Sequence, residues 1–338
     1  MQVHGGLDDN HLMNVDFNQT LEQITATWQG ALRLPDWALI RAEGPDAADF
    51  LHGQLSQDVS HLGPDQARLA AYCSAKGRMQ ASAILLRPQP DQVWLLTDSG
   101  VLPGWLKRLR MFVLRSKVQL SEGGIEAWGL SGEQARVALG GAADSAPWHS
   151  QAHAGGQLLR LPDVMQAPRW VWIGPADSAG WLSPLPTLSA QAWLSLEVLS
   201  GVPRITSATI DQFVPQMVNF ELVGGVNFQK GCYPGQEIVA RSQYRGTVKR
   251  RLFLAWVDSE HVEAKAGQEV FAARDGEQPV GMVVLATRLP ASAGAGQLIQ
   301  LELKLAAADD ALTLAAPDGP RLQGLPLPYA LPAPDDEA

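Results

Sequence analysis

Apolar residues follow two different spacings along the first 240 residues of the chain. In some short segments they occupy alternate positions, as in strands, and in others they recur every three or four positions, as on one face of a helix. Strands are predicted over residues 37–40, 68–73, 79–87, 92–97, 158–161 and 169–173. Helices are predicted after Gly44, over 101–114, up to Leu139 and over 187–200. Such a mixture of short strands and helices is typical of an α+β fold.

Beyond Arg241 the pattern changes to strands alone. We expect strands over 249–257, 269–273, 280–287 and 298–305, separated by Gly, Pro and Asp. In the last of them Ile299, Leu301 and Leu303 alternate with polar residues, which predicts a sheet with one buried and one exposed face. Roughly 90 residues of this kind are suited to a small β-barrel or sandwich.

These patterns divide the chain into four parts. Residues 1–30 are polar with little periodicity and are expected to form a poorly ordered arm. Residues 31–245 are expected to form an α+β core, residues 246–331 a C-terminal β-barrel domain, and residues 332–338 an acidic tail.

Composition and charge exclude several classes of protein. The 338 residues are 46% hydrophobic and 18% charged, which is ordinary for a globular protein. The net charge of −9 argues against a protein that coats nucleic acid or a membrane through bulk electrostatics. Cys73 and Cys232 alone do not make a disulfide framework, and the N-terminus lacks the basic start and apolar run of a leader. Because no apolar stretch is long enough to span a bilayer, we expect a cytoplasmic protein without membrane contacts.

The segment 227–241, Asn-Phe-Gln-Lys-Gly-Cys-Tyr-Pro-Gly-Gln-Glu-Ile-Val-Ala-Arg, is the most specific signal in the sequence. Pro234 fixes φ at the value that the second position of a turn needs, and Gly235 tolerates the positive φ of the third position. A type II turn is therefore predicted to begin at Tyr233. A short helix is predicted to follow this turn and to run to Arg241.

Cys232 stands just before this predicted helix. Unpaired N–H groups and the dipole at a helix N-terminus favour a thiolate, and the ammonium of Lys230 two residues upstream favours it as well. Cys232 is therefore the candidate catalytic residue, with Lys230 as its electrostatic partner. The plainer interpretation, a small buried hydrophobic residue beside a turn, stays open from the residues alone.

A second group of candidates is cationic and lies on the helix predicted over 101–114. Lys107, Arg108 and Arg110 stand close together in a chain that is acidic as a whole. Such a patch is either a solvated helix face or an anchor for an anionic tail or an RNA backbone.

The segment 227–241 resembles the signature of the YgfZ family, which are folate-binding proteins related in fold to the aminomethyltransferase (T-protein) of the glycine cleavage system. The residues that carry the resemblance are Lys230, Gly231, Cys232, Tyr233, Gly235, Gln236, Glu237 and Arg241. Segments 36–39, 51–59, 71–79, 193–203 and 213–219 resemble other parts of the family's sequences. The resemblance extends over residues 33–331.

The resemblance implies an α+β, T-protein-like fold, in which two interleaved α+β subdomains span residues 31–245 and a β-barrel domain follows. It implies tetrahydrofolate, a reduced folate, as the cofactor, contacted by Trp37 and Trp193. It also implies that Cys232 assists the assembly or repair of iron–sulfur clusters in client enzymes, including enzymes that thiolate tRNA. No metal site of the chain's own is expected, since a cluster is usually held by four thiolates and the chain has two.

Two other functions compete with this one. A folate-dependent one-carbon transferase needs a carboxylate after the hairpin turn at Gly77, where the T-protein has its catalytic one, and here Gln80 and Ala81 follow. We therefore expect an accessory protein without aminomethyltransferase activity. The other alternative is a non-catalytic module that contacts tRNA or a protein partner through the cationic helix, and the net charge argues against it as the main role.

Overall fold

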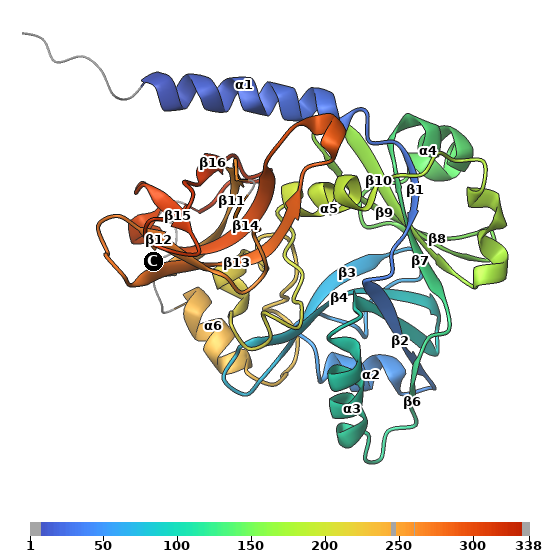
Figure 1. Cartoon of the computed structure of the whole chain (residues 1–338). Helices are drawn as coiled ribbons and strands as arrows, with labels where there is room; N and C mark the ends of the chain where they lie inside the picture. Colours follow the sequence, from blue (N-terminus) through green and yellow to red (C-terminus); the bar gives the residue numbers. More distant parts are fainter. Residues whose placement is uncertain (1–7, 245–247, 260, 333–338) are drawn as a thin grey trace, which may run out of the picture.

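The computed structural model describes residues 8–244, 248–259 and 261–332. Over these residues the strands form three antiparallel sheets (Figure 1). The chain leaves the first sheet after β1, builds the second with β2 to β6, returns to the first with β7 to β10, and then enters the third. The expected α+β fold with two interleaved subdomains is confirmed. In the described part of the chain, no helix is both long and apolar enough to cross a membrane.

The first sheet has the strand order β1-β7-β10-β9-β8 over the described residues. Its strands are β1 (Gly30–Arg33), β7 (Glu126–Ser131), β8 (Ser150–His153), β9 (Gly156–Val164) and β10 (Ala167–Gly174). The helical segments beside it are α4 (Gly132–Leu139), η1 (Gly140–Asp144) and η2 (Ala176–Leu182). Ala135 and Leu139 of α4 pack with the buried Trp170 and Trp172 of β10.

The second sheet has the strand order β3-β4-β5-β2-β6. Its strands are β2 (Trp37–Glu43), β3 (Ala67–Cys73), β4 (Met79–Gln89), β5 (Gln92–Asp98) and β6 (Gln119–Glu122), and its helices are α2 (Ala47–His52) and α3 (Leu102–Phe112). Leu85 and Leu95 form one side of a core with Trp105 and Leu109 of α3. The strands predicted over 68–73, 79–87 and 92–97 are confirmed as β3, β4 and β5, whereas β6 was not predicted.

The third sheet has the strand order β15-β12-β13-β14-β11-β16 and curls into a half-barrel. Its strands are β11 (Arg250–Val257), β12 (Glu269–Ala272), β13 (Pro279–Arg288), β14 (Gln297–Lys304), β15 (Leu312–Leu314) and β16 (Gln323–Leu325). Two 3-10 turns join them, η4 (Ala291–Ala293) and η5 (Leu305–Ala307). Helix α5 (Ala190–Leu199) packs on β13 and β14. Two further helical segments, η3 (Pro215–Val218) and α6 (Gln236–Tyr244), lie between α5 and β11 in sequence.

The prediction of a sheet with one exposed face is wrong for β14, which is buried on both faces. Ile299 and Leu301 belong to the core inside the half-barrel. On the opposite face Gln300 donates to backbone carbonyls at the end of α5, and Glu302 pairs with Arg250 of β11. These polar side chains tolerate burial because each meets hydrogen-bonding partners.

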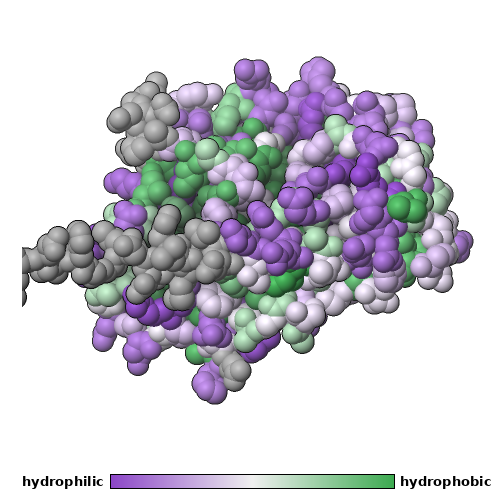
Figure 2. Space-filling model, turned by 90° about the horizontal axis from the view of Figure 1, so that it is seen from above, coloured by the Kyte–Doolittle hydropathy of each residue, from purple (hydrophilic) through white to green (hydrophobic). Residues whose placement is uncertain are grey.

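Helix α1 (Asp8–Thr25) stands where a poorly ordered arm was expected, which corrects the prediction over those residues. The ring of Phe17 lies 4.5 Å from that of Trp256 between centroids, and Leu21 is fully buried. Phe17, Leu21 and Ile24 recur at helical spacing, a signal that the polar composition of the segment obscured. Residues 1–7 and nearly all of the expected tail over 332–338 lie outside the described residues. Seen from above, apolar side chains gather on the half-barrel's side of the molecule, and polar ones cover most of the rest (Figure 2).

The largest core lies where the three sheets meet. It contains Val171 from the first sheet, Leu69 from the second and Leu285 from the third, together with Trp193 and Leu196 of α5. Helix α5 is therefore packed into the junction of all three sheets, and the pocket described next opens in this core.

Candidate functional site

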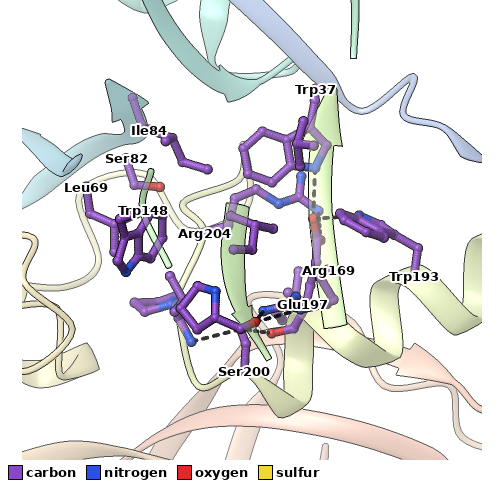
Figure 3. A pocket seen from close by; sticks show the side chains of 17 residues that line it. Trp37, Leu69, Ser82, Ile84, Trp148, Arg169, Trp193, Glu197, Ser200 and Arg204 are labelled. Atoms are coloured by element: carbon purple, nitrogen blue, oxygen red, sulfur yellow. Dashed lines mark hydrogen bonds and ion pairs between the residues drawn. The ribbon is translucent and has the colours of Figure 1, made fainter. Parts of the chain in front are cut away.

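A pocket in the central core is lined by α5 and by residues from all three sheets (Figure 3). Its apolar wall includes Trp37, Leu69, Ile84, Trp148, Leu161, Val171, Trp193 and Leu285. Its polar groups are Ser82, Arg169, Glu197, Ser200 and Arg204. An apolar wall with a few convergent polar groups is the usual construction of a site for a small organic ligand.

The carboxylate of Glu197 is the point on which the polar groups converge. Trp37 Nε1 donates to Glu197 Oε1 at 2.9 Å, and Trp193 Nε1 donates to the same oxygen at 3.1 Å (Figure 3). Arg204 Nη2 donates to the other oxygen at 3.0 Å. Glu197 is buried, and a buried carboxylate requires such donors to offset the loss of water. The two tryptophans predicted as folate contacts are therefore brought together by one acidic residue.

Arg204 joins this carboxylate to a second one. Its Nη1 donates to Asp98 Oδ2 at 2.5 Å, and its guanidinium lies over the ring of Trp37, 5.0 Å from the centroid. Burial lowers the pKa of Arg204, but Glu197 and Asp98 outweigh burial and the net shift is upward. For Asp98 the effect of burial is the opposite: burial raises the pKa of this carboxyl, and the contact with Arg204 offsets only part of that rise. The buried Nε of Arg204 has no hydrogen-bond partner within the described residues.

Helix α5 presents Trp193 and Glu197 on one face because they are four residues apart. Ser189 caps the start of the helix, accepting from Ala192 N at 3.1 Å, and Gly201 ends it with a φ of +64°. Arg169, fully buried, donates to the backbone carbonyl of Leu196 at 3.2 Å and fixes the helix to β10. Burial lowers the pKa of Arg169 to about 10.

The signature segment contains the predicted turn and helix. Gln236 N donates to Tyr233 O at 3.2 Å and Gly235 has a φ of +79°, which confirms a type II turn, and α6 follows it. A Cβ added at Gly235 would lie 2.3 Å from Ser74 O. Ser74 begins the hairpin turn between β3 and β4, so two segments that resemble the same family meet at this point.

Within the signature segment, Cys232 is exposed, whereas Lys230 before it and Tyr233 after it are buried. Tyr233 belongs to the central core. The ammonium of Lys230 donates to the backbone carbonyls of His52 and Leu55, the second at 2.7 Å, so it holds the signature segment against the end of α2. Burial lowers the pKa of Lys230 to about 8. Lys230 is thus an anchor of the loop as well as a charge near Cys232.

The remaining candidates lie apart from the pocket. Gly231, Glu237 and Arg241 are exposed and Gln236 is half-buried. Lys107, Arg108 and Arg110 are all exposed on α3, and Arg110 also donates to Leu120 O at 2.8 Å. None of these residues, nor Cys232 or Lys230, lines the pocket. Among the described residues, no group of three or more His, Cys, Asp and Glu side chains is arranged to hold a metal ion.

Glu197, Arg204 and Asp98 were missed by the sequence interpretation. One signal for Glu197 was available, because it is the single charged residue in an otherwise apolar helix and stands four positions after Trp193. Asp98 had no such signal, since its partner Arg204 is 106 residues away.

The three-sheet fold is that of the glycine cleavage T-protein. Over 92% of this chain and 89% of the other, the structure is similar to the crystal structure of glycine cleavage system aminomethyltransferase T from Bartonella henselae, with a TM-score of 0.73 and 17% sequence identity. The chain is also 33% identical over 309 residues to the tRNA-modifying protein YgfZ of Edwardsiella ictaluri (strain 93-146), covering 88% of this chain and 92% of that protein. The chain therefore belongs to the YgfZ family. No family model matches it.

Proposed function

We propose that this protein binds a reduced folate in the central pocket and that it acts in tRNA modification. Folate binding is supported by the convergence of Trp37, Trp193 and Arg204 on the carboxylate of Glu197. A pterin ring is flat, aromatic and rich in N–H groups and ring nitrogens, so apolar walls bind its faces while a carboxylate and a guanidinium recognise its edge. The part in tRNA modification is supported by the name of the Edwardsiella relative.

The residues present fit such a ligand. The carboxylate of Glu197 accepts from N–H groups, and the guanidinium of Arg204 beside it supplies a positive charge and N–H donors. Arg204 already covers one face of Trp37, so the ligand stacks on the face that the guanidinium leaves open. When bound, the folate supplies either one-carbon chemistry or a conformational signal.

Cys232 is proposed as the reactive residue of the second activity, the assembly or repair of iron–sulfur clusters in client enzymes. Its thiol is exposed, and the ammonium of Lys230 is near enough to interact with it electrostatically. A thiol at the surface can reach iron or sulfur held by another protein. Enzymes that thiolate tRNA are among the proposed clients, which connects this activity to tRNA modification.

The aminomethyl transfer of the T-protein is not proposed for this chain. On β4 the pocket is lined by Ser82, Ala83 and Ile84, and the strand has no Asp or Glu from Met79 to Gln89. Gln80 donates to Asp211 Oδ2 at 3.0 Å. A hydroxyl or amide does not replace the charge of a carboxylate that steers the folate nitrogens.

The folate site is tested by titrating tetrahydrofolate against tryptophan fluorescence. We expect Trp37→Ala to weaken binding by about 1–3 kcal/mol, because an aromatic wall and a donor to Glu197 are lost together. Trp128→Ala is the matched control, since Trp128 Nε1 also donates to a carboxylate, that of Glu126 at 3.0 Å, but Trp128 lies outside the pocket. Equal affinities for wild type and Trp37→Ala would place the folate elsewhere.

A further inference from the structure

A histidine stands beside the signature segment and plays no part in the function proposed above. His52 is the last residue of α2, and its Nδ1 lies 3.1 Å from Asp58 Oδ1. A Cβ added at Gly231 would lie 3.6 Å from His52 Nε2. The two ring nitrogens therefore have different surroundings: Nδ1 meets a carboxylate, and Nε2 faces the backbone immediately before Cys232.

The carboxylate decides which nitrogen carries the proton. An ionised Asp58 can only accept, so Nδ1 is the protonated nitrogen and Nε2 keeps a free lone pair. The backbone N–H of Ser60 also approaches Nδ1, but at 3.5 Å, longer than the contact with Asp58. Burial lowers the pKa of His52 and the ammonium of Lys230 lowers it further, while Asp58 and Asp49 act in the opposite direction without reversing the shift. The imidazole is consequently neutral near pH 7 and able to accept a proton.

Lys230 fixes the distance between the histidine and the cysteine loop. Its ammonium donates to the backbone carbonyl of His52 itself and to that of Leu55. The residue two positions before Cys232 is thus bonded to the residue that carries the imidazole. This contact holds the residue that carries the imidazole against the loop that contains Cys232.

We propose that His52, oriented by Asp58, is the proton acceptor for Cys232. The thiol proton moves from Sγ to Nε2, which leaves a thiolate beside an imidazolium, and the carboxylate of Asp58 stabilises the new positive charge. The step consumes no other reagent. The proposal for His52 rests on the function proposed above for Cys232 and adds the group that accepts its proton.

The test is the rate at which iodoacetamide alkylates Cys232 between pH 5.5 and 9.5, followed by mass spectrometry of the purified full-length chain. In this reaction an Sγ–carbon bond forms and iodide leaves. We expect His52→Gln to slow alkylation about tenfold at pH 7, to move the pH profile upward and to leave the rate near pH 9.5 almost unchanged, because hydroxide then removes the proton. Asp58→Asn should shift the profile in the same direction by a smaller amount.

His61→Gln is the matched control, since His61 Nδ1 also contacts Asp58, at 2.8 Å, but its ring is 83% exposed. Its profile should equal that of wild type. A wild-type profile in His52→Gln, or a slowing that is the same at pH 7 and pH 9.5, would overturn the proposal. Alkylation of the buried Cys73 would show that His52→Gln does not fold. In that case the pH profile of Asp58→Asn is judged by the same criteria. No client enzyme or folate enters this assay, so its failure is distinct from a failure of the cluster-related function.

Discussion

At the scale of single residues, the two cysteines of the chain have opposite surroundings. Cys73 is buried at the end of β3, and Cys232 is exposed in the signature loop. Burial, with a smaller effect from Asp211, raises the pKa of the Cys73 thiol to about 12. Cys73 therefore stays a thiol in the folded protein, which makes it a poor nucleophile.

The burial of Cys73 predicts a pH dependence of stability. The pKa of Cys73 is about 12 in the folded protein and 9.0 in the unfolded one. The contribution of this thiol to the free energy of unfolding is therefore complete below pH 9 and is lost as the pH rises toward 12. Relative to Cys73→Ala, the free energy of unfolding of the wild type should fall by up to about 1.4 kcal/mol per pH unit above pH 9. Urea unfolding at pH 8, 9 and 10 measures this difference. Parallel pH dependences for the two proteins would show that Cys73 does not hold its proton.

At the scale of elements, the signature turn is built for contact with the hairpin turn between β3 and β4. Gly235 requires the left-handed region at a φ of +79°, and the space where its Cβ would stand is occupied by Ser74 O at 2.3 Å and Gly77 Cα at 2.7 Å. The family signature is therefore partly a packing motif, and Cys232 is positioned by a contact between two turns.

Gly235→Ala should destabilise the protein by about 2–4 kcal/mol, because the backbone of Ser74 must shift and a positive φ is strained for Ala. Gly231→Ala provides the control within the same loop. Its nearest atom, His52 Nε2, is 3.6 Å away, an ordinary contact, so a change within about 0.5 kcal/mol is expected. Chemical denaturation of both variants measures the difference, and equal stabilities would contradict this account of the turn.

What the sequence predicted correctly is local. The strands β2 to β5 and β11 to β14 follow from alternating apolar residues, and the signature turn follows from a Pro-Gly pair. Among the groups that it missed, Arg204 meets Asp98 across 106 positions, and no spacing rule records such a pair. The prediction of an exposed face on β14 failed for the same reason, since α5 covers that face and Gln300 meets Glu197 O across 103 positions.

At the scale of the whole molecule, the half-barrel supports the helix that carries two residues of the pocket. Gln300 of β14 donates to the carbonyls of Glu197, Val198 and Val202 at 3.2, 3.0 and 3.3 Å, at the end of α5 where helix carbonyls lack partners. Helix α5 carries Trp193 and Glu197, so the C-terminal sheet shapes the pocket by holding this helix. The sheet also contributes Leu285 directly to the pocket wall.

Gln300→Leu should cost about 1–3 kcal/mol of stability, because buried carbonyls lose their donor, and should also weaken folate binding. Gln297→Leu is the matched control. Gln297 lies on the same strand and is equally buried, but it donates to Ser259 and Val262 inside the half-barrel. It should lower stability without changing folate affinity. Unchanged folate affinity in folded Gln300→Leu would mean that the half-barrel does not shape the pocket.

The central claim is that an exposed thiol in the signature loop serves client enzymes while a separate pocket binds folate. The most direct measurement is complementation of a deletion strain with Cys232→Ser, read as the activity of iron–sulfur enzymes and the level of tRNA thiolation. Cys73→Ala at matched protein level is the control, because that thiol is buried. The account predicts that Cys232→Ser binds tetrahydrofolate normally yet fails to restore either readout, whereas Cys73→Ala restores both. Full restoration by Cys232→Ser would contradict it.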